Sequence, residues 1–139
     1  MSRQAVIVDT NVVVAGLLTG NDVSPVARIL DGMLAAAFPF VVSEALLAEY
    51  RTVLVRPSLR KLHGLTVNEV ETFLTDMAQH AIVLGTVAAP PAPDPGDSLL
   101  WDLLAAKADL LLVTGDKLLP GMRGRLISPR EFVAGVWPT

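Results

Sequence analysis

Two aspartates stand where buried strands of this sequence are expected to end. Asp9 directly follows the apolar residues 5–8, and Asp116 comes three residues after Val113, the last residue of another apolar run. An aspartate after a strand is most often a turn residue. However, the carboxyl ends of neighbouring parallel strands meet at one edge of a sheet, where the functional groups of such folds collect. We therefore expect the two carboxylates to lie close together.

Two further acids could join them from predicted helices. Glu49 lies at the margin of the apolar face of one helix, and Asp97 begins the helix that follows a proline-rich connector. Asp97 is equally well explained as an acid of the first helical turn, with Asp94 as the N-cap. Glu44 and Asp102 are expected to be ordinary surface acids.

Four carboxylates in one place repel each other, and the sequence offers little basic charge to offset them. No lysine or arginine adjoins Asp9, and Lys117 beside Asp116 is a single charge. The chain has no cysteine and only two histidines, so oxygen ligands would select Mg²⁺ or Mn²⁺ over zinc. Two such ions about 4 Å apart suit in-line attack of an activated water on a phosphodiester.

Alternating apolar strands and amphipathic helices must position these acids. The strands are apolar on both faces, which is typical of parallel sheets covered by helices. With 139 residues, 52% of them hydrophobic, we expect one α/β domain over residues 1–139. The expected strands are 5–8, 38–42, 81–84 and 110–113, with 126–127 at an edge; the expected helices are 25–37, 43–55, 66–78, 97–107 and a short one from 128.

Several of these helices carry a start or stop signal. Pro57 is expected to end the helix of residues 43–55, and the residues after Asn11 are expected to form a loop. The sequences at residues 66–69 and 128–131 match the capping box. The expected N-caps are Ser24, Ser43, Thr66 and Ser128.

The basic residues gather in one stretch although the net charge is −3. That net charge argues against a surface that binds phosphates everywhere. No acid occurs between Tyr50 and Asn68, a stretch that holds four basic residues: Arg51, Arg56, Arg60 and Lys61. They form either the solvated end of a helix or a contact for nucleic acid, and the sequence leaves both interpretations open.

No segment of the sequence has the character of a membrane span. The uncharged run of residues 32–43 is too short and is interrupted by Pro39, and the first residues lack the apolar core and cleavage site of a signal peptide. We expect a cytoplasmic protein without membrane contact. Its high apolar content indicates a surface that a partner covers.

Four short motifs together carry a resemblance to a known family. They are residues 6–12 (VIVDTNV), 43–50 (SEALLAEY) with Arg56 and Pro57, 94–97 (DPGD) and 113–116 (VTGD), in this order. With them the sequence resembles a PIN domain over essentially its whole length, and more narrowly the PIN-family toxins of bacterial toxin–antitoxin systems. The resemblance implies a three-layer α/β/α sandwich with a central parallel sheet of four or five strands. It also implies cleavage of single-stranded RNA with Mg²⁺ or Mn²⁺.

The resemblance further implies which residues form the site. The catalytic and metal-binding acids of the family fall on Asp9, Glu49, Asp97 and Asp116. Asn11 and Thr114 match neighbours that orient ligands and water, and Asp94 matches an outer helper. Glu44 is a rival for Glu49, but Glu49 fits better because it precedes an aromatic residue.

The resemblance also implies partners. Besides RNA, which the four basic residues named above would contact, such toxins are held inactive by a small cognate antitoxin laid over the active-site side. The apolar content fits that cover, or a contact with a second copy of the chain. Leu17, Leu18 and Val23 are our expected partner contacts.

Other protein classes begin with a similar strand and aspartate. A phosphatase of the haloacid dehalogenase type needs a second aspartate where this chain has Asn11. A response-regulator receiver domain needs an acidic pair that is absent here. It also needs a threonine and a lysine on separate strand ends, whereas Thr114 and Lys117 share one loop in this chain. The remaining alternative is a catalytically weak PIN fold that binds RNA or a partner, and the presence of all four acids argues against it.

Overall fold

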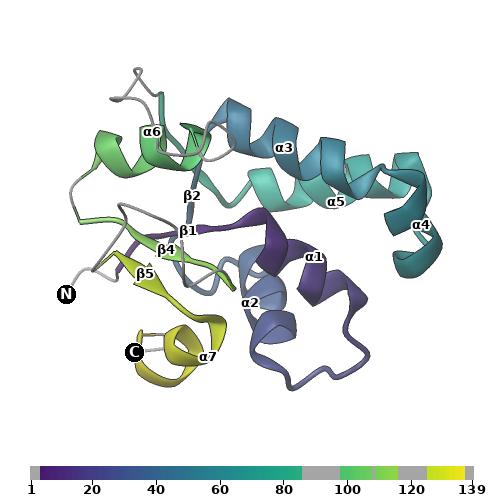
Figure 1. Cartoon of the computed structure of the whole chain (residues 1–139), viewed down its shortest axis with the longest axis horizontal. Helices are drawn as coiled ribbons and strands as arrows, with labels where there is room; N and C mark the ends of the chain where they lie inside the picture. The colour runs from purple at the N-terminus through teal and green to yellow at the C-terminus, as the bar shows by residue number, and fades with distance from the viewer. Residues whose placement is uncertain (1–3, 86–97, 108, 116–124, 137–139) are drawn as a thin grey trace.

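The computed structural model describes residues 4–85, 98–107, 109–115 and 125–136 (Figure 1). None of the helices in this described part is long and apolar enough to cross a membrane. The elements, in chain order, are β1 (Val6–Val8), α1 (Thr10–Leu18), α2 (Pro25–Leu34), β2 (Val41–Val42), α3 (Glu44–Leu54), α4 (Pro57–His63), α5 (Val67–Ala78), β3 (Ile82–Val83), α6 (Ser98–Ala106), β4 (Leu111–Val113), β5 (Leu126–Ile127), α7 (Pro129–Glu131) and a π-helical turn (Phe132–Val136).

All the strand pairs of the described residues are parallel. β1 pairs with β4, with Val8 opposite Val113, and β4 pairs with β5, with Val113 opposite Ile127. β2 and β3 form a separate pair, which a single bridge between Val6 and Phe40 joins to β1. The predicted α/β class with parallel strands is confirmed. The strands form sheets of three and two instead of one sheet of four or five, because the short β2 meets β1 at only one bridge.

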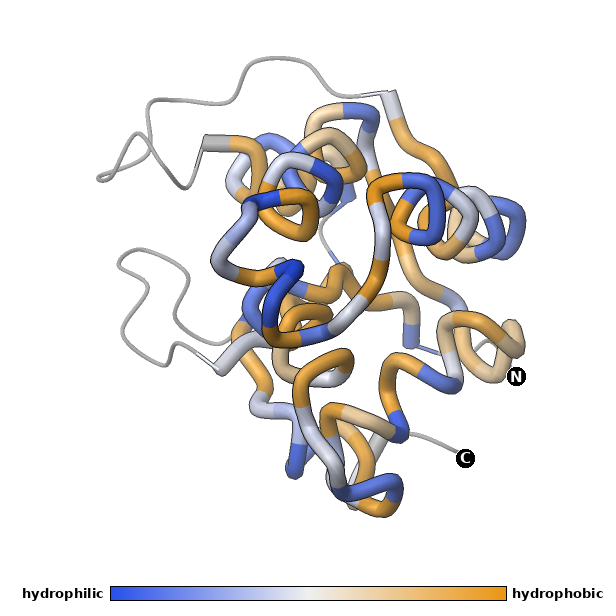
Figure 2. The backbone as a smooth tube through the Cα atoms, turned by 90° about the vertical axis from the view of Figure 1, so that its right-hand side faces the viewer, coloured by the Kyte–Doolittle hydropathy of each residue, from blue (hydrophilic) through white to orange (hydrophobic). Residues whose placement is uncertain are grey.

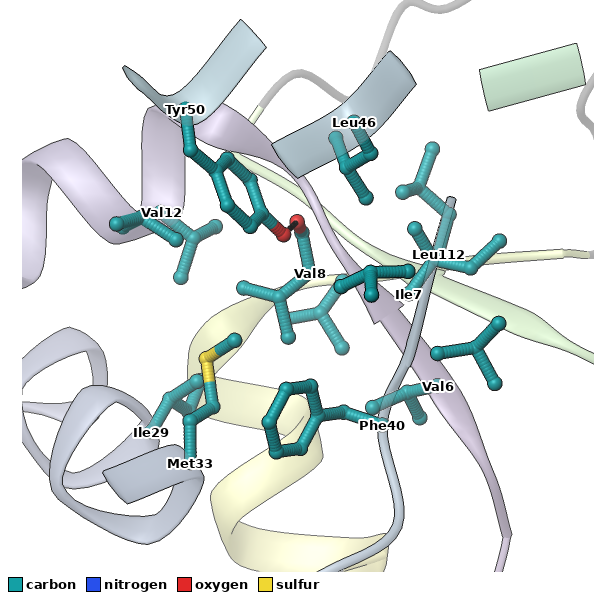
Figure 3. Close-up of a cluster of buried hydrophobic side chains, with 14 of the residues drawn as sticks. Val6, Ile7, Val8, Val12, Ile29, Met33, Phe40, Leu46, Tyr50 and Leu112 are labelled. Atoms are coloured by element: carbon teal, nitrogen blue, oxygen red, sulfur yellow. Dashed lines mark hydrogen bonds between the residues drawn. The ribbon is translucent and has the colours of Figure 1, made fainter. Parts of the chain in front are cut away.

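Helices cover both sides of the strands. In Figure 1, α3 and α6 lie on one side of β1 and β4, and α2 and α7 lie on the other. Hydrophobic and hydrophilic residues alternate along the helices (Figure 2), as expected where a helix turns one face toward a core. The fully buried side chains of this core include Ile7, Ile29, Phe40, Leu46 and Leu112 (Figure 3). These layers agree with the predicted α/β/α sandwich.

The expected helix starts are confirmed in detail. Each of the four expected N-cap side chains accepts a hydrogen bond from a backbone N–H in the first turn of its helix, at 3.1–3.3 Å. Both predicted capping boxes are complete, because the Glu69 and Glu131 carboxylates accept a hydrogen bond from the backbone N–H of the N-cap residue. Local side-chain chemistry therefore fixes where α2, α3, α5 and α7 begin.

A helix, α1, replaces the loop that was expected after Asn11. Its sequence, TNVVVAGLL, is apolar on nearly every side and lacks the periodic polar face by which a surface helix is recognised. It packs closely against α2, where a Cβ on Gly16 would lie 2.8 Å from the carbonyl oxygen of Val26. This close approach explains the glycine in the middle of the helix.

Pro57 begins a helix of its own instead of only ending the previous one. α3 stops at Leu54, and Pro57 is the first residue of α4, a position where its missing N–H has no helical partner to lose. α4 ends at Gly64, whose φ of 74° is left-handed. Part of the basic stretch therefore lies on a short separate helix.

Arg125, just before β5, is a structural cation. Its guanidinium donates to the carbonyl oxygens of Leu104, Lys107 and Leu110 at 2.7–3.1 Å. These carbonyls lie at the end of α6 and in the turn that leads into β4, so Arg125 ties β5 to that turn. Leu112 N–H completes the tie by donating to the Arg125 carbonyl oxygen at 2.8 Å.

Candidate active site

The carboxyl ends of β1 and β4 bring two polar residues together inside the apolar core. The register places Val8 opposite Val113, so the next residues, Asp9 and Thr114, are neighbours. Asp9 is only 9% exposed and Thr114 only 1%. A buried carboxylate is costly unless hydrogen bonds or a cation stabilise its charge, so its partners decide what this site can do.

The side chains of three residues form a hydrogen-bonded network around the Asp9 carboxylate. Thr114 Oγ1 donates to Asp9 Oδ2 at 2.8 Å, and Asn11 Nδ2 lies 3.4 Å from the same oxygen and 3.3 Å from Thr114 Oγ1. The Gly115 N–H donates to Asn11 Oδ1 at 3.2 Å, which fixes the orientation of the amide. The network links residues more than 100 positions apart in the sequence and holds the carboxylate in one orientation.

Asp9 stands between β1 and α1, and its backbone is hydrogen-bonded both to β4 and to the first turn of α1. Its N–H donates to Val113 O at 2.9 Å, and its carbonyl oxygen accepts the Val12 N–H that opens α1 at 3.0 Å. Asp9 is thus the N-cap of α1, where an aspartate side chain usually accepts a bond from the helix backbone. It makes no such bond. Its carboxylate turns to Thr114 and Asn11 instead.

Helix α3 contributes a second carboxylate and a phenol. Thr10 Oγ1 donates to Glu49 Oε2, which ties this half-buried acid to the residue after Asp9. Tyr50 is fully buried, and its hydroxyl donates to the carbonyl oxygen of Val8 at the end of β1 (Figure 3). Burial, and then the negative charges of Asp9 and Glu49, raise the pKa of the Tyr50 phenol well above its ordinary value. The two carboxylates therefore act on the same small region.

The structure describes part of the predicted site and brings that part together. Asp9, Asn11 and Thr114 are hydrogen-bonded to each other, and Glu49 contacts their neighbour Thr10. The predicted residues Asp94, Asp97 and Asp116 lie outside the described residues. The described part contains no cluster of three or more histidine or acidic side chains able to hold a metal ion. The four-acid site thus stays a prediction.

Glu49 and its rival Glu44 differ clearly in their surroundings. Glu49 is half-buried and hydrogen-bonded to Thr10, whereas Glu44 is exposed in the first turn of α3. Glu44 makes no side-chain hydrogen bond or ion pair within the described part of the chain. The geometry therefore favours Glu49 as the acid that α3 contributes.

Three residues of the site do not figure in the sequence-based prediction of the site. They are Thr10, Tyr50 and Gly115. Thr10 donates to Glu49, Tyr50 donates to the end of β1, and the Gly115 N–H donates to Asn11. Thr10 and Gly115 adjoin predicted site residues, and that position is the signal that could have found them. Tyr50 is the only tyrosine of the chain, but only its burial in the fold shows its role.

The four basic residues predicted to bind RNA occupy different environments. Arg51 on α3 forms an ion pair with Glu71 on α5, so part of its charge is offset. Arg56 is exposed, and Arg60 and Lys61 line a hollow of about 390 Å³ beside α4. The Arg60 Nε atom is buried and has no hydrogen-bond partner among the described residues. RNA binding by these residues stays a prediction.

A larger hollow lies on another part of the described surface. This hollow, of about 610 Å³, lies between α1, α2 and α5, with an apolar floor that includes Leu17 and Phe73. Its rim carries three acids: Asp31, Glu69 and Asp76. Of the expected partner contacts, Leu17 lines this hollow, Leu18 is 38% exposed and Val23 is 77% exposed.

Comparison with known proteins gives one match. The family model described as PIN domain matches residues 5–118 of the 139-residue chain, a range that includes every predicted site acid. Neither the curated proteins nor the solved structures yielded a match.

Proposed function

The chain belongs to the PIN domain family, whose members are generally nucleases, and we propose that it is a divalent-metal-dependent endoribonuclease that hydrolyses single-stranded RNA. One observation carries the proposal: a buried carboxylate, Asp9, is held by Thr114 and Asn11 at the carboxyl ends of β1 and β4. Functional groups of parallel α/β folds collect at this edge. A nuclease needs such an oriented acid where its substrate can arrive.

The donor atoms at this site fit a hard divalent cation. The polar side-chain atoms of Asp9, Glu49 and Thr114 are all oxygens, the kind of ligand that Mg²⁺ and Mn²⁺ select. We propose Asp9, Glu49, Asp97 and Asp116 as the metal ligands, with Asp94 as an outer helper. When bound, the metal would lower the pKa of a water molecule and stabilise the charge that develops on the phosphodiester.

The other residues of the site position these acids. Thr114 and Asn11 hold the Asp9 carboxylate, and the Gly115 N–H keeps the Asn11 amide from turning. Thr10 holds Glu49 in the same way. Mutation of residues that hydrogen-bond to metal ligands commonly lowers metal affinity or activity about 10- to 100-fold.

A cleavage assay with a matched control tests the proposal. Purified protein should cut a labelled single-stranded RNA with Mn²⁺ or Mg²⁺ and stop when EDTA is added. Asp9→Asn and Glu49→Gln should each abolish cutting, whereas Glu44→Gln, which removes the same charge from the same helix, should leave it unchanged. Cleavage in the presence of EDTA, or none with any divalent ion, would refute the assignment. RNA binding without cleavage would favour the alternative, a PIN fold that serves only as a binding module.

We further propose that the nuclease is the toxin of a type II toxin–antitoxin pair. The hollow between α1, α2 and α5 combines an apolar floor with three acids, which complements a basic amphipathic segment of an antitoxin. The product of the adjacent short reading frame should co-purify with the chain, and Asp76→Lys should weaken that complex. Failure of any adjacent product to bind would leave a ribonuclease of another pathway.

A further inference from the structure

Two neighbouring hollows adjoin the Asp9 network. One, of about 420 Å³, is lined by Asn11; the other, of about 400 Å³, reaches Arg130. Both are also lined by Val26, Gly115 and Pro129, so they adjoin along these three residues. We call the two together the 11–130 groove. Each hollow has the size of a site for a small organic molecule.

One end of the 11–130 groove touches the candidate active site. Asn11, which lines it, places its amide nitrogen 3.4 Å from Asp9 Oδ2, and Gly115 donates its N–H to the same amide. A ligand that fills the groove would therefore have one end beside the Asp9 carboxylate.

The walls of the groove combine apolar surface with one available cation. Val26, Pro25 and Pro129 provide the apolar part, and among the described residues that line the two hollows there is no aspartate or glutamate. The exposed Arg130 side chain makes no hydrogen bond or ion pair with the described residues, unlike Arg51 and Arg125. Such a surface suits a ligand with one flat apolar part and one anionic part.

A nucleotide has these two parts. We propose that the 11–130 groove binds the nucleotide next to the bond that is cut, with its base against Val26 and Pro129 and its phosphate on Arg130. This inference rests on the proposed ribonuclease function and extends it to a substrate-binding site. The two other hollows described above fit this role less well. The hollow between α1, α2 and α5 carries acids that repel phosphate, and the hollow beside α4 shares no lining residue with the groove.

The phosphate contact is tested by removing the guanidinium. Arg130→Ala should raise the KM for a short single-stranded RNA about 3- to 10-fold and leave kcat nearly unchanged. In an Asp9→Asn background, where binding is measured without cleavage, it should lower the slope of log affinity against log salt by about 0.7. Arg130→Lys should keep most of that slope because it keeps the charge.

A matched control comes from the opposite edge of the sheet. Lys107 is exposed and stands at the end of α6, before the amino end of β4. Lys107→Ala removes one positive charge far from the carboxyl ends of the strands and should change neither KM nor the salt slope.

The base contact is tested by changing the RNA. Once the cut position is mapped, an abasic nucleotide is placed on each side of it in turn. One of these RNAs should raise the KM of the unmodified protein about 3- to 10-fold, and Val26→Ala should reduce that effect. An unchanged KM and salt slope in Arg130→Ala, with no abasic effect, would overturn the groove and leave the ribonuclease intact. If the unmodified protein neither cuts nor binds RNA, the proposed function fails and the groove proposal fails with it.

Discussion

Replacing Thr114 by valine should test the hydroxyl group that holds the Asp9 carboxylate. Valine keeps the shape of threonine but has no hydroxyl, so Asp9 Oδ2 loses its 2.8 Å donor while both residues stay buried. A hydrogen bond to a charged group contributes about 1.5–3 kcal/mol. With about 0.3 kcal/mol/K of unfolding entropy for 139 residues, that loss lowers Tm by about 5–10 °C. Cleavage should fall about 10- to 100-fold, because the acid is no longer held in one orientation.

Thr114→Ser is the control for this change. Serine restores the hydroxyl and lacks only a methyl group, which costs about 1 kcal/mol in a core. Urea unfolding with and without Mn²⁺, together with the cleavage rate, should therefore place the serine protein near the wild type and the valine protein well below it. If the valine protein unfolds within about 0.5 kcal/mol of the wild type and still cuts RNA, the hydroxyl does not hold the carboxylate and the reasoning is wrong.

Three further substitutions test the supporting structure. Tyr50→Phe should cost about 1–3 kcal/mol at neutral pH. Urea unfolding at a series of pH values should show that above about pH 10 the wild type loses stability that the Tyr50→Phe protein does not lose. The reason is that the phenol releases its proton in the unfolded chain but retains it in the folded one, where burial raises its pKa. Gly16→Ala should cost about 1–3 kcal/mol in thermal unfolding, because its Cβ would lie 2.8 Å from the Val26 carbonyl oxygen, whereas Gly20→Ala meets open space and should be neutral. Arg125→Lys should lower the free energy of unfolding in urea by about 2 kcal/mol, because a lysine ammonium cannot donate to the three carbonyl oxygens that the planar guanidinium reaches. An unchanged urea midpoint would show that these hydrogen bonds do not stabilise the fold.

The parts of the fold that the sequence predicts are those with a local chemical signature. Ser43 and Thr66 start helices because their hydroxyls bind nearby N–H groups, and those contacts are only three residues apart. The buried strands are recognised by their uniform apolar character. α1 is not predicted, because its sequence lacks such a local signature. It is apolar nearly all round and buried against α2, so it shows no helical period.

In the site, too, the residues next to strand ends are predictable from the sequence, whereas the contacts that depend on helix packing are not. Asp9 and Asp116 are expected together because both follow strands, but Asp116 lies outside the described residues. The register of β1 and β4 instead makes Asp9 a neighbour of Thr114, which only the family resemblance assigns to the site. The contact between Thr10 and Glu49 depends on how α3 is rotated against α1, which is set by packing of residues distant in the sequence. Glu49 is a candidate from its place at the margin of a predicted apolar helix face, and the family resemblance favours it over Glu44, whereas Tyr50 is missed as a member of the site.

The N-cap position of Asp9 has a consequence for how this protein trades stability against activity. The carboxylate that would normally stabilise the start of α1 is directed away from the helix, toward Thr114 and Asn11. A serine or asparagine at position 9 would be free to cap α1 and would remove a buried negative charge. Selection for heat resistance alone would therefore enrich inactive proteins at this position, and an aspartate persists there only under selection for activity.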